Sequence, residues 1–204
     1  EIVDPAAVLH EMRLFKSKEE LDLMRRAVEI TRDAHVEAMQ KTRPGMYEFE
    51  VEALLRAAFR KHGAERTAYQ PIVGSGPNAT VLHYRKNDRQ MQDGDLLLID
   101  AGCEYGYYAS DVTRTFPVGG RWGSAQRDIY EIVLEAQLAS IAAVRPGATL
   151  DDVHRASVKV IAAGLIRLGL LSGSLDKVIE EQTYKSYYIH RTSHYIGMDV
   201  HDVG

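Results

Sequence analysis

The chain has 204 residues, of which 45% are hydrophobic and 26% charged, and this is ordinary for one globular domain or at most two small ones. Acidic residues outnumber basic ones by 29 to 25, and a net charge of −4 argues against nucleic acid or an anionic membrane as the main partner. No apolar run approaches the ~18 residues of a transmembrane helix. The single cysteine, Cys103, cannot form an internal disulfide, which favours a reducing, cytoplasmic location.

Helical patterns fill the first part of the chain. Ser17, followed three residues later by Glu20, is the pattern of a capping box and predicts a helix of about six turns. This helix ends at the Thr-Arg-Pro-Gly of residues 42–45, because proline and glycine interrupt helical spacing. A second helix is predicted from Tyr47 to about His62.

Strand patterns follow between Tyr69 and Val118. Apolar and β-branched residues alternate there with polar ones, and glycine, proline and asparagine punctuate them. The segments expected in strands are 70–76, 79–84, 95–102 and 109–118.

Helical spacing returns in the second part of the chain. It covers residues 124–144, stops at a second Arg-Pro-Gly and resumes over 149–169, where Thr149 and Asp152 form the expected cap. Residues 184–204 are again aromatic, punctuated by glycine and typical of strands.

The two Arg-Pro-Gly sequences indicate an internal repeat. They occupy residues 43–45 and 145–147, 102 residues apart, and each stands between two amphipathic helices that precede a strand-rich segment. The order predicts a duplicated α-α-β-β unit. The second copy has fewer residues after its turn than the first, so we expect the second half to be incomplete at the C-terminus.

Asp100 and Asp111 are the first candidates for chemistry. If 96–102 and 110–116 form a hairpin around Tyr105-Gly106, the two aspartates face each other. Two buried, facing carboxylates need either a shared proton or a cation between them. The alternative is structural: Asp100 begins a turn and Asp111 faces solvent.

Four of the eight histidines fall in the strand-like segments: His83, His190, His194 and His201. Each would more often be a structural residue if it stood alone, but their clustering raises the prospect of a site. His190 and His194 have the spacing of a helical metal pair, yet the glutamate of an HExxH motif is absent. No glycine-rich phosphate-binding motif is present, so nucleotide binding has no support.

Three segments carry a resemblance to a known family: IDAGCEYGYYASDVTRTFPV, VGSGPNATVLHY and HRTSHYIGMDVHDVG. The chain resembles the metallopeptidases of the pita-bread fold, which include aminopeptidase P, prolidase and methionine aminopeptidase, and in particular the bacterial aminopeptidase P (Xaa-Pro aminopeptidase) group. The resemblance covers essentially the whole chain. It implies an α+β fold in which two pseudo-twofold-related α-α-β-β units surround a curved, mostly antiparallel sheet.

The resemblance also implies a centre of two divalent metal ions, most commonly Mn²⁺. Asp100 matches the aspartate that chelates one metal, Asp111 the bridging aspartate and His194 the histidine ligand. His83 matches the histidine that lines the site near the metal-bound hydroxide, and His201 the one that contacts the scissile carbonyl. His190 matches a third histidine of the site. A pair of cations held by carboxylates would supply a hydroxide nucleophile and polarise a peptide bond.

Two glutamate ligands of the family lie beyond the DVHDVG motif, and one of them also transfers the proton. No residue here matches either, so residues 1–204 are expected to be one C-terminally truncated catalytic domain, without the N-terminal domain of its parent. The fragment by itself is expected to bind metal weakly and to be inactive.

The function implied for the parent is a metal-dependent exopeptidase that releases the N-terminal residue from peptides with proline in second position. A homo-oligomer is the implied assembly. The near alternative is an Xaa-Pro dipeptidase (prolidase). An alternative of another class is a non-catalytic pita-bread module that binds proteins, but such relatives tend to lose metal ligands, whereas Asp100, Asp111 and His194 are present. The same residues count against a metal-free, creatinase-type enzyme.

Overall fold

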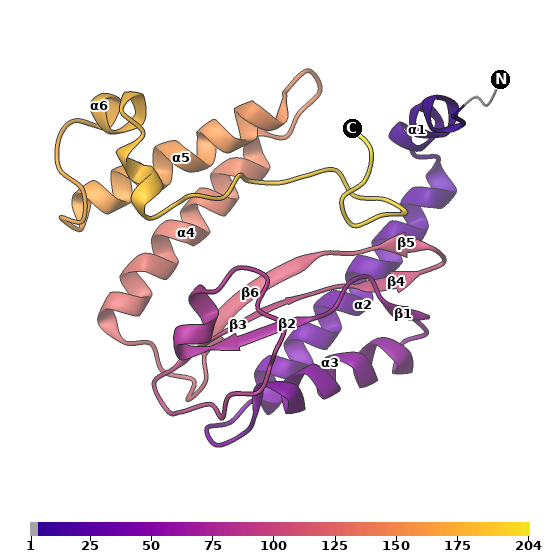
Figure 1. Ribbon diagram of the computed structural model, residues 1–204, viewed down its shortest axis with the longest axis horizontal. Coiled ribbons are helices and arrows are strands. Elements are labelled where there is room, and N and C mark those ends of the chain that lie inside the picture. Colours follow the sequence, from indigo (N-terminus) through magenta and orange to yellow (C-terminus); the bar gives the residue numbers. More distant parts are fainter. Residues whose placement is uncertain (1–3) are drawn as a thin grey trace. The chain divides into compact units, whose positions relative to one another are not determined.

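A computed structural model describes residues 4–204 (Figure 1). It contains two compact units, one made of Glu1–Arg121 together with Tyr195–Gly204, the other of Trp122–His194. The elements of the first unit are α1 (Ala6–Leu14), α2 (Lys18–Lys41), α3 (Glu48–Lys61), β1 (Arg66–Thr67), β2 (Ile72–Ser75), the 3₁₀ helix η1 (Gly76–Thr80), β3 (Leu96–Ala101), β4 (Cys103–Tyr105), β5 (Tyr108–Ala109) and β6 (Val112–Pro117).

The two long helices of the first unit begin and end where the sequence predicts. The Ser17 hydroxyl accepts a hydrogen bond from the Glu20 amide at 3.3 Å, and the Glu20 carboxylate accepts one from the Ser17 amide at 2.6 Å, which confirms the capping box before α2. After α2, the Met46 amide donates to the Arg43 carbonyl at 3.3 Å around Gly45, whose φ is +89°. Pro44 and Gly45 thus occupy the two central positions of a type II turn.

The strands form two small antiparallel sheets, with orders β2-β3-β6 and β1-β4-β5. Burial alternates along β3: Leu97, Ile99 and Ala101 are fully buried in the core with side chains of α2 and α3, while the intervening residues are half-buried. Successive side chains of a strand point to opposite faces. The helices therefore cover one face of β3 (Figure 1), and Asp100 belongs to the other face.

The β4–β5 hairpin turns one residue later than expected. Tyr105 pairs with Tyr108, and the two turn residues, Gly106 and Tyr107, have φ of +57° and +70°. Positive φ at both central residues defines a type I′ turn, which matches the twist of the strands. The predicted register was therefore wrong, because Asp100 pairs with Thr113 rather than with Asp111.

Gly102 joins the two sheets. A Cβ atom at this position would lie 1.6 Å from the Ser110 carbonyl oxygen, so only glycine fits where the chain passes from β3 to β4. On the opposite strand, Ser110 and Asp111 form the break between β5 and β6, and the Ser110 amide donates to the Cys103 carbonyl at 3.0 Å. Because of this break, Asp111 makes no regular strand pairing and lies directly beside the first paired residue of β6, Val112.

The second unit is a helical hairpin with a small cap. Its elements are α4 (Ser124–Ala143), α5 (Leu150–Arg167), α6 (Leu175–Glu180) and the 3₁₀ helix η2 (Thr183–Ser186). Between α4 and α5, the Ala148 amide donates to the Arg145 carbonyl at 3.0 Å around Gly147, whose φ is +85°. The second Arg-Pro-Gly turn thus repeats the conformation of the first, and the predicted repeat of helix pairs is confirmed.

Two predicted strands are absent from the part of the chain that the structure describes. Residues 79–84 belong to η1 and to turns, and residues 184–204 form η2 and irregular backbone. A strand needs a neighbour to satisfy its backbone groups, and the one bond to a strand in the final segment is from the Ala109 amide to the Gly197 carbonyl, at 2.8 Å. Among residues 4–204, no helix is both long and apolar enough to cross a membrane.

Candidate functional site

A cavity of about 410 Å³ opens in the first unit, on the face of β3 that α2 and α3 leave uncovered. Its walls combine carboxylates, imidazoles and one guanidinium group with a few apolar side chains. The lining residues are Ala68, Tyr69, Gln70, Ile72, His83, Arg85, Asp100, Asp111, Val200 and His201.

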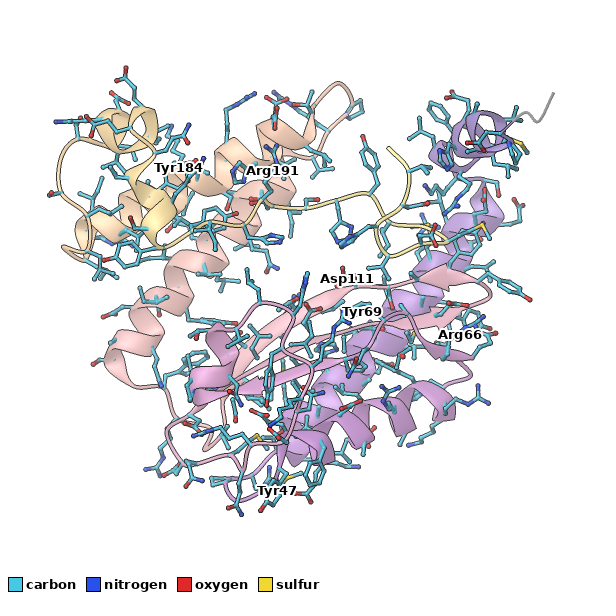
Figure 2. The ribbon with its side chains drawn as sticks, viewed as in Figure 1. Tyr47, Arg66, Tyr69, Asp111, Tyr184 and Arg191 are labelled. Atoms are coloured by element: carbon cyan, nitrogen blue, oxygen red, sulfur yellow. The ribbon has the colours of Figure 1, made fainter. Side chains whose placement is uncertain are left out.

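The two aspartates meet at the Tyr69 hydroxyl, and Figure 2 labels Tyr69 and Asp111, which lie close to each other. The hydroxyl oxygen lies 2.5 Å from Oδ1 of Asp100 and 2.7 Å from Oδ1 of Asp111. Asp100 stands at the end of β3 and pairs across the sheet with Ile72, while Asp111 comes from the break between β5 and β6. Both aspartates are half-buried, so the structural alternative of a turn residue and a solvent-facing residue is wrong.

Electrostatics make this carboxylate pair costly. Burial is the main cause that raises the pKa of Asp100; the hydrogen bond from Tyr69 lowers it and the charge of Asp111 raises it, and the net shift is upward. Burial, followed by the charges of Asp100 and Asp111, also raises the pKa of Tyr69, which keeps its proton at neutral pH. A single O–H can donate to one carboxylate at a time. Two like charges this close together favour a shared proton or a cation between them.

The donor set of the pair fits a hard divalent cation. Carboxylate oxygens are the ligands that manganese, magnesium and calcium prefer, and a cation would compensate both charges at once. Within residues 4–204, however, no three His, Cys, Asp or Glu side chains are grouped so that they could hold a metal ion. The pair thus supplies part of a coordination sphere.

Four of the six predicted site residues line this one cavity: His83, Asp100, Asp111 and His201. His190 and His194 lie in the second unit and are exposed there. His190 donates from Nδ1 to the Arg191 carbonyl at 2.8 Å. The backbone around both histidines is irregular, so they do not form the helical metal pair that their spacing alone would allow and that the missing HExxH glutamate argued against.

The segment that carries His201 is fixed to the N-terminal helices by ion pairs. The Asp202 side chain is 1% exposed, and its two oxygens lie 2.5 Å from the Arg13 guanidinium and 3.1 Å from the Lys16 ammonium group. Arg13 also contacts Asp199 at 2.6 Å. A buried carboxylate with two cations is strongly oriented, so the backbone next to His201 has a defined position.

In the second unit, the chain before His194 is held against α5. Thr192 lies 3.2 Å from Nδ1 of His154 and hydrogen-bonds the Tyr188 hydroxyl, which in turn accepts a bond from Ser157 at 3.1 Å. Asp151 pairs with Arg191. These contacts order the residues that precede His194.

Sequence reasoning missed Tyr69, Gln70 and Arg85. Tyr69 precedes β2 by three residues, and its place follows from the pairing of Ile72 with Asp100, a register that no local pattern predicts. Arg85 directly follows the predicted strand of residues 79–84, which is absent from the structure. The Arg85 carbonyl accepts a hydrogen bond from the Gln70 side-chain amide at 3.1 Å.

Comparison with known proteins identifies the family of this chain. Residues 22–204 match the model of metallopeptidase family M24. The chain is 49% identical over 203 residues to the Xaa-Pro aminopeptidase of Escherichia coli and 47% identical over 204 residues to that of Haemophilus influenzae, covering 100% of this chain and 46% and 47% of those proteins. The chain therefore spans about half the length of these relatives.

Solved structures give the same result. The aminopeptidase PepP of Pseudomonas aeruginosa is 51% identical, with a TM-score of 0.97 over 99% of this chain and 46% of its own. A zinc-substituted aminopeptidase P of E. coli in complex with product is 50% identical, with the same TM-score and coverage. The likeness confirms the predicted α+β pita-bread fold.

Proposed function

Because this chain belongs to metallopeptidase family M24, we propose that the protein is a metal-dependent exopeptidase that releases the N-terminal residue from peptides with proline in second position. The relatives named Xaa-Pro aminopeptidase support this substrate class. The observation that carries the proposal is the pair of facing carboxylates, Asp100 and Asp111, at a cavity that also holds His83 and His201.

We propose that Asp100, Asp111 and His194 are metal ligands, and that two further carboxylates come from outside these 204 residues, as in the family this chain resembles. Two divalent cations, when bound, supply a nucleophile near neutral pH and polarise the peptide carbonyl. The carboxylate-rich donor set favours Mn²⁺. One relative's structure is described as zinc-substituted, so the metal must be measured for this protein.

The chain's own residues then have separate tasks. The Tyr69 hydroxyl donates a hydrogen bond to one carboxylate of the pair at a time and so orients both. His83 and His201 stand at the cavity as hydrogen-bond donors for the substrate carbonyl and the developing negative charge. We assign His190 a supporting role in the same reaction, on the resemblance.

The wider setting is also a proposal. Residues 1–204 would belong to a single pita-bread catalytic domain, and the full-length protein would be a homo-oligomer, as the resemblance implies. Cys103 is fully buried and unpaired, which suits a cytoplasmic protein.

The test is hydrolysis of Xaa-Pro peptides by the full-length protein. We expect it to release the first residue of an Xaa-Pro-Yaa tripeptide, to lose activity on chelation and to recover it with Mn²⁺. Asp100→Ala should lose both activity and metal. Cleavage confined to Xaa-Pro dipeptides would favour prolidase, whereas an intact metal-free protein that cleaves neither would favour the binding module.

A further inference from the structure

The loop of residues 76–90 carries His83 and Arg85 to the cavity with little regular structure of its own. After η1 it contains turns and irregular backbone, and only residue 90 makes a strand-type bridge, with Tyr47. His83 has φ of +52°, a conformation that side chains with a Cβ rarely adopt. Such conformations persist where the surrounding structure imposes them.

The constraint comes from Glu48, the first residue of α3, which is fully buried. Five donors converge on its carboxylate, and all five belong to the loop and its preceding strand residue. They are the Ser75 amide and hydroxyl, both at 2.7 Å, the Asn78 side-chain amide at 3.2 Å, the Tyr84 hydroxyl at 2.8 Å and the Arg89 amide at 3.0 Å.

These donors span the loop. Ser75 precedes it, Tyr84 follows His83 directly, and Arg89 lies near its end, where the Arg89 carbonyl also accepts a bond from the Glu48 amide at 3.0 Å. One carboxylate therefore ties the beginning, middle and end of the segment to the first turn of α3. The N-terminal end of a helix favours a negative charge, so Glu48 stands where its charge is stabilised.

A second contact holds the same loop one helical turn further along α3. The Asn87 side-chain amide donates to Glu52 at 2.7 Å, and its oxygen accepts from the Val73 amide at 3.0 Å. Asn87 is buried and has φ of +48°. It fixes the loop after Arg85 as Glu48 fixes it around His83.

We propose that Glu48 is a positioning residue: its buried carboxylate holds the 76–90 loop so that His83 stays at the cavity beside Asp100 and Asp111. All five partners donate, and a carboxylate is the side chain that only accepts. A glutamine there would turn an NH₂ group toward at least one donor. The kinetic consequence rests on the proposed peptidase function, whereas the positioning itself does not.

The test compares Glu48→Gln with Glu50→Gln in the full-length protein. Glu50 lies in the same first turn of α3, is exposed, and uses one oxygen to accept from the Tyr47 amide, which glutamine can also do. Amide hydrogen exchange of residues 76–90, the NMR resonances of the His83 ring and kcat/KM on an Xaa-Pro tripeptide are measured for each variant.

We expect Glu48→Gln to speed exchange in the loop, to shift or broaden the His83 signals and to lower kcat/KM about ten- to hundred-fold, since small displacements of reacting groups cost that much. Glu50→Gln should match the wild type in all three measurements. Wild-type loop exchange and His83 signals in Glu48→Gln would overturn the proposal, as would a mobile loop with unchanged kcat/KM.

Two further outcomes are decided by the same measurements. If the wild type cleaves no Xaa-Pro peptide, the proposed function fails, while loop exchange and the His83 signals still judge the role of Glu48. If Glu48→Gln does not fold, Tyr84→Phe removes one of the five donors and leaves the carboxylate in place. It should then show the same changes to a smaller degree, and wild-type behaviour would overturn the proposal.

Discussion

The Tyr69 hydroxyl lies within 2.7 Å of one oxygen each of Asp100 and Asp111, so a single phenol bridges two carboxylates that come from different strand ends. The bridge brings Asp111 to Asp100 although the two residues are not paired in the sheet. The geometry of the candidate metal site thus depends on a residue that is itself no expected metal ligand.

Replacing Tyr69 with phenylalanine should weaken metal binding. The ring would still fill its place, but the two carboxylates would lose the donor that orients them, and loss of such a supporting hydrogen bond typically costs ten- to hundred-fold in affinity. Calorimetric titration of the chelator-treated, full-length protein with Mn²⁺ measures the change. Tyr107→Phe, at an exposed turn position, is the control, and an affinity equal in both variants would contradict the role of Tyr69.

Asp100→Asn should stabilise the metal-free protein while it abolishes metal binding. Burial raises the pKa of Asp100, so its ionised form is a cost to the folded state that is present above this raised pKa and relieved as the pH falls through it. An amide has no such cost. We expect a higher Tm than wild type at pH 7 without metal, and no rise on adding Mn²⁺. Asp128→Asn, at an exposed position of α4, should change neither quantity.

His35, in α2, is 2% exposed, and its Nδ1 donates to the Thr31 carbonyl at 2.9 Å. Burial lowers its pKa below the ordinary value near 6.5. The unfolded state therefore binds the proton more tightly, so this contribution to stability is complete above about pH 6.5 and declines as the pH falls below it. An NMR titration should find the low pKa, and His35→Gln should flatten the pH dependence of unfolding between pH 5 and 6.5. A measured pKa at or above 6.5 would refute this account.

Gly102→Ala should unfold or severely weaken the first unit. A Cβ atom there would lie 1.6 Å from the Ser110 carbonyl oxygen, and because the Cβ position is fixed by the backbone and the oxygen belongs to it, the hairpin itself must move. The expected loss in the free energy of unfolding is at least about 3 kcal/mol. Gly123→Ala meets only the flexible end of Gln126, at 3.2 Å, and should cost about 1 kcal/mol or less. Denaturant unfolding monitored in each variant distinguishes the two.

Asp202→Asn should loosen the segment that carries His201. The substitution removes the negative charge that faces Lys16 and Arg13, whose side chains are 11% and 26% exposed, while Arg13 keeps Asp199 as a partner. We expect the cost to stay below the about 3 to 5 kcal/mol of a broken, fully buried ion pair. Faster amide exchange in residues 195–204, with α3 unaffected, is the expected result. Asp199→Asn, whose side chain is 67% exposed, should have a much smaller effect. Equal exchange in both variants would show that the ion pairs do not hold the segment.

The sequence predicted those features that depend on near neighbours. The capping box at Ser17 and Glu20 and the turn at Gly45 are built from residues a few positions apart, so one sequence is enough to predict them. The carboxylate pair was found for the same reason, since Asp100 and Asp111 flank one hairpin. Its register was missed because Tyr107 adopts a positive φ, which tyrosine seldom does.

The remaining features depend on distant partners. Residues 79–84 have the apolar, β-branched composition of a strand, but Glu48 draws Asn78 and Tyr84 into a different conformation. The pairing of β2 with β3 places Tyr69 next to the aspartates, and no sequence pattern around Tyr69 predicts that pairing. Tertiary contacts therefore override local propensity where the candidate site is assembled.

The ion pair between Arg13 and Asp202 joins residues separated by 189 positions, and this separation affects the order in which the parts of the site form during folding. The helical hairpins and the β4–β5 hairpin close over short stretches and can form early, whereas contacts between remote residues must first overcome a larger loss of chain entropy. His201 is therefore expected to reach the cavity after the carboxylate pair has formed. A nascent chain would hold its aspartates in place before the last of its cavity histidines arrives.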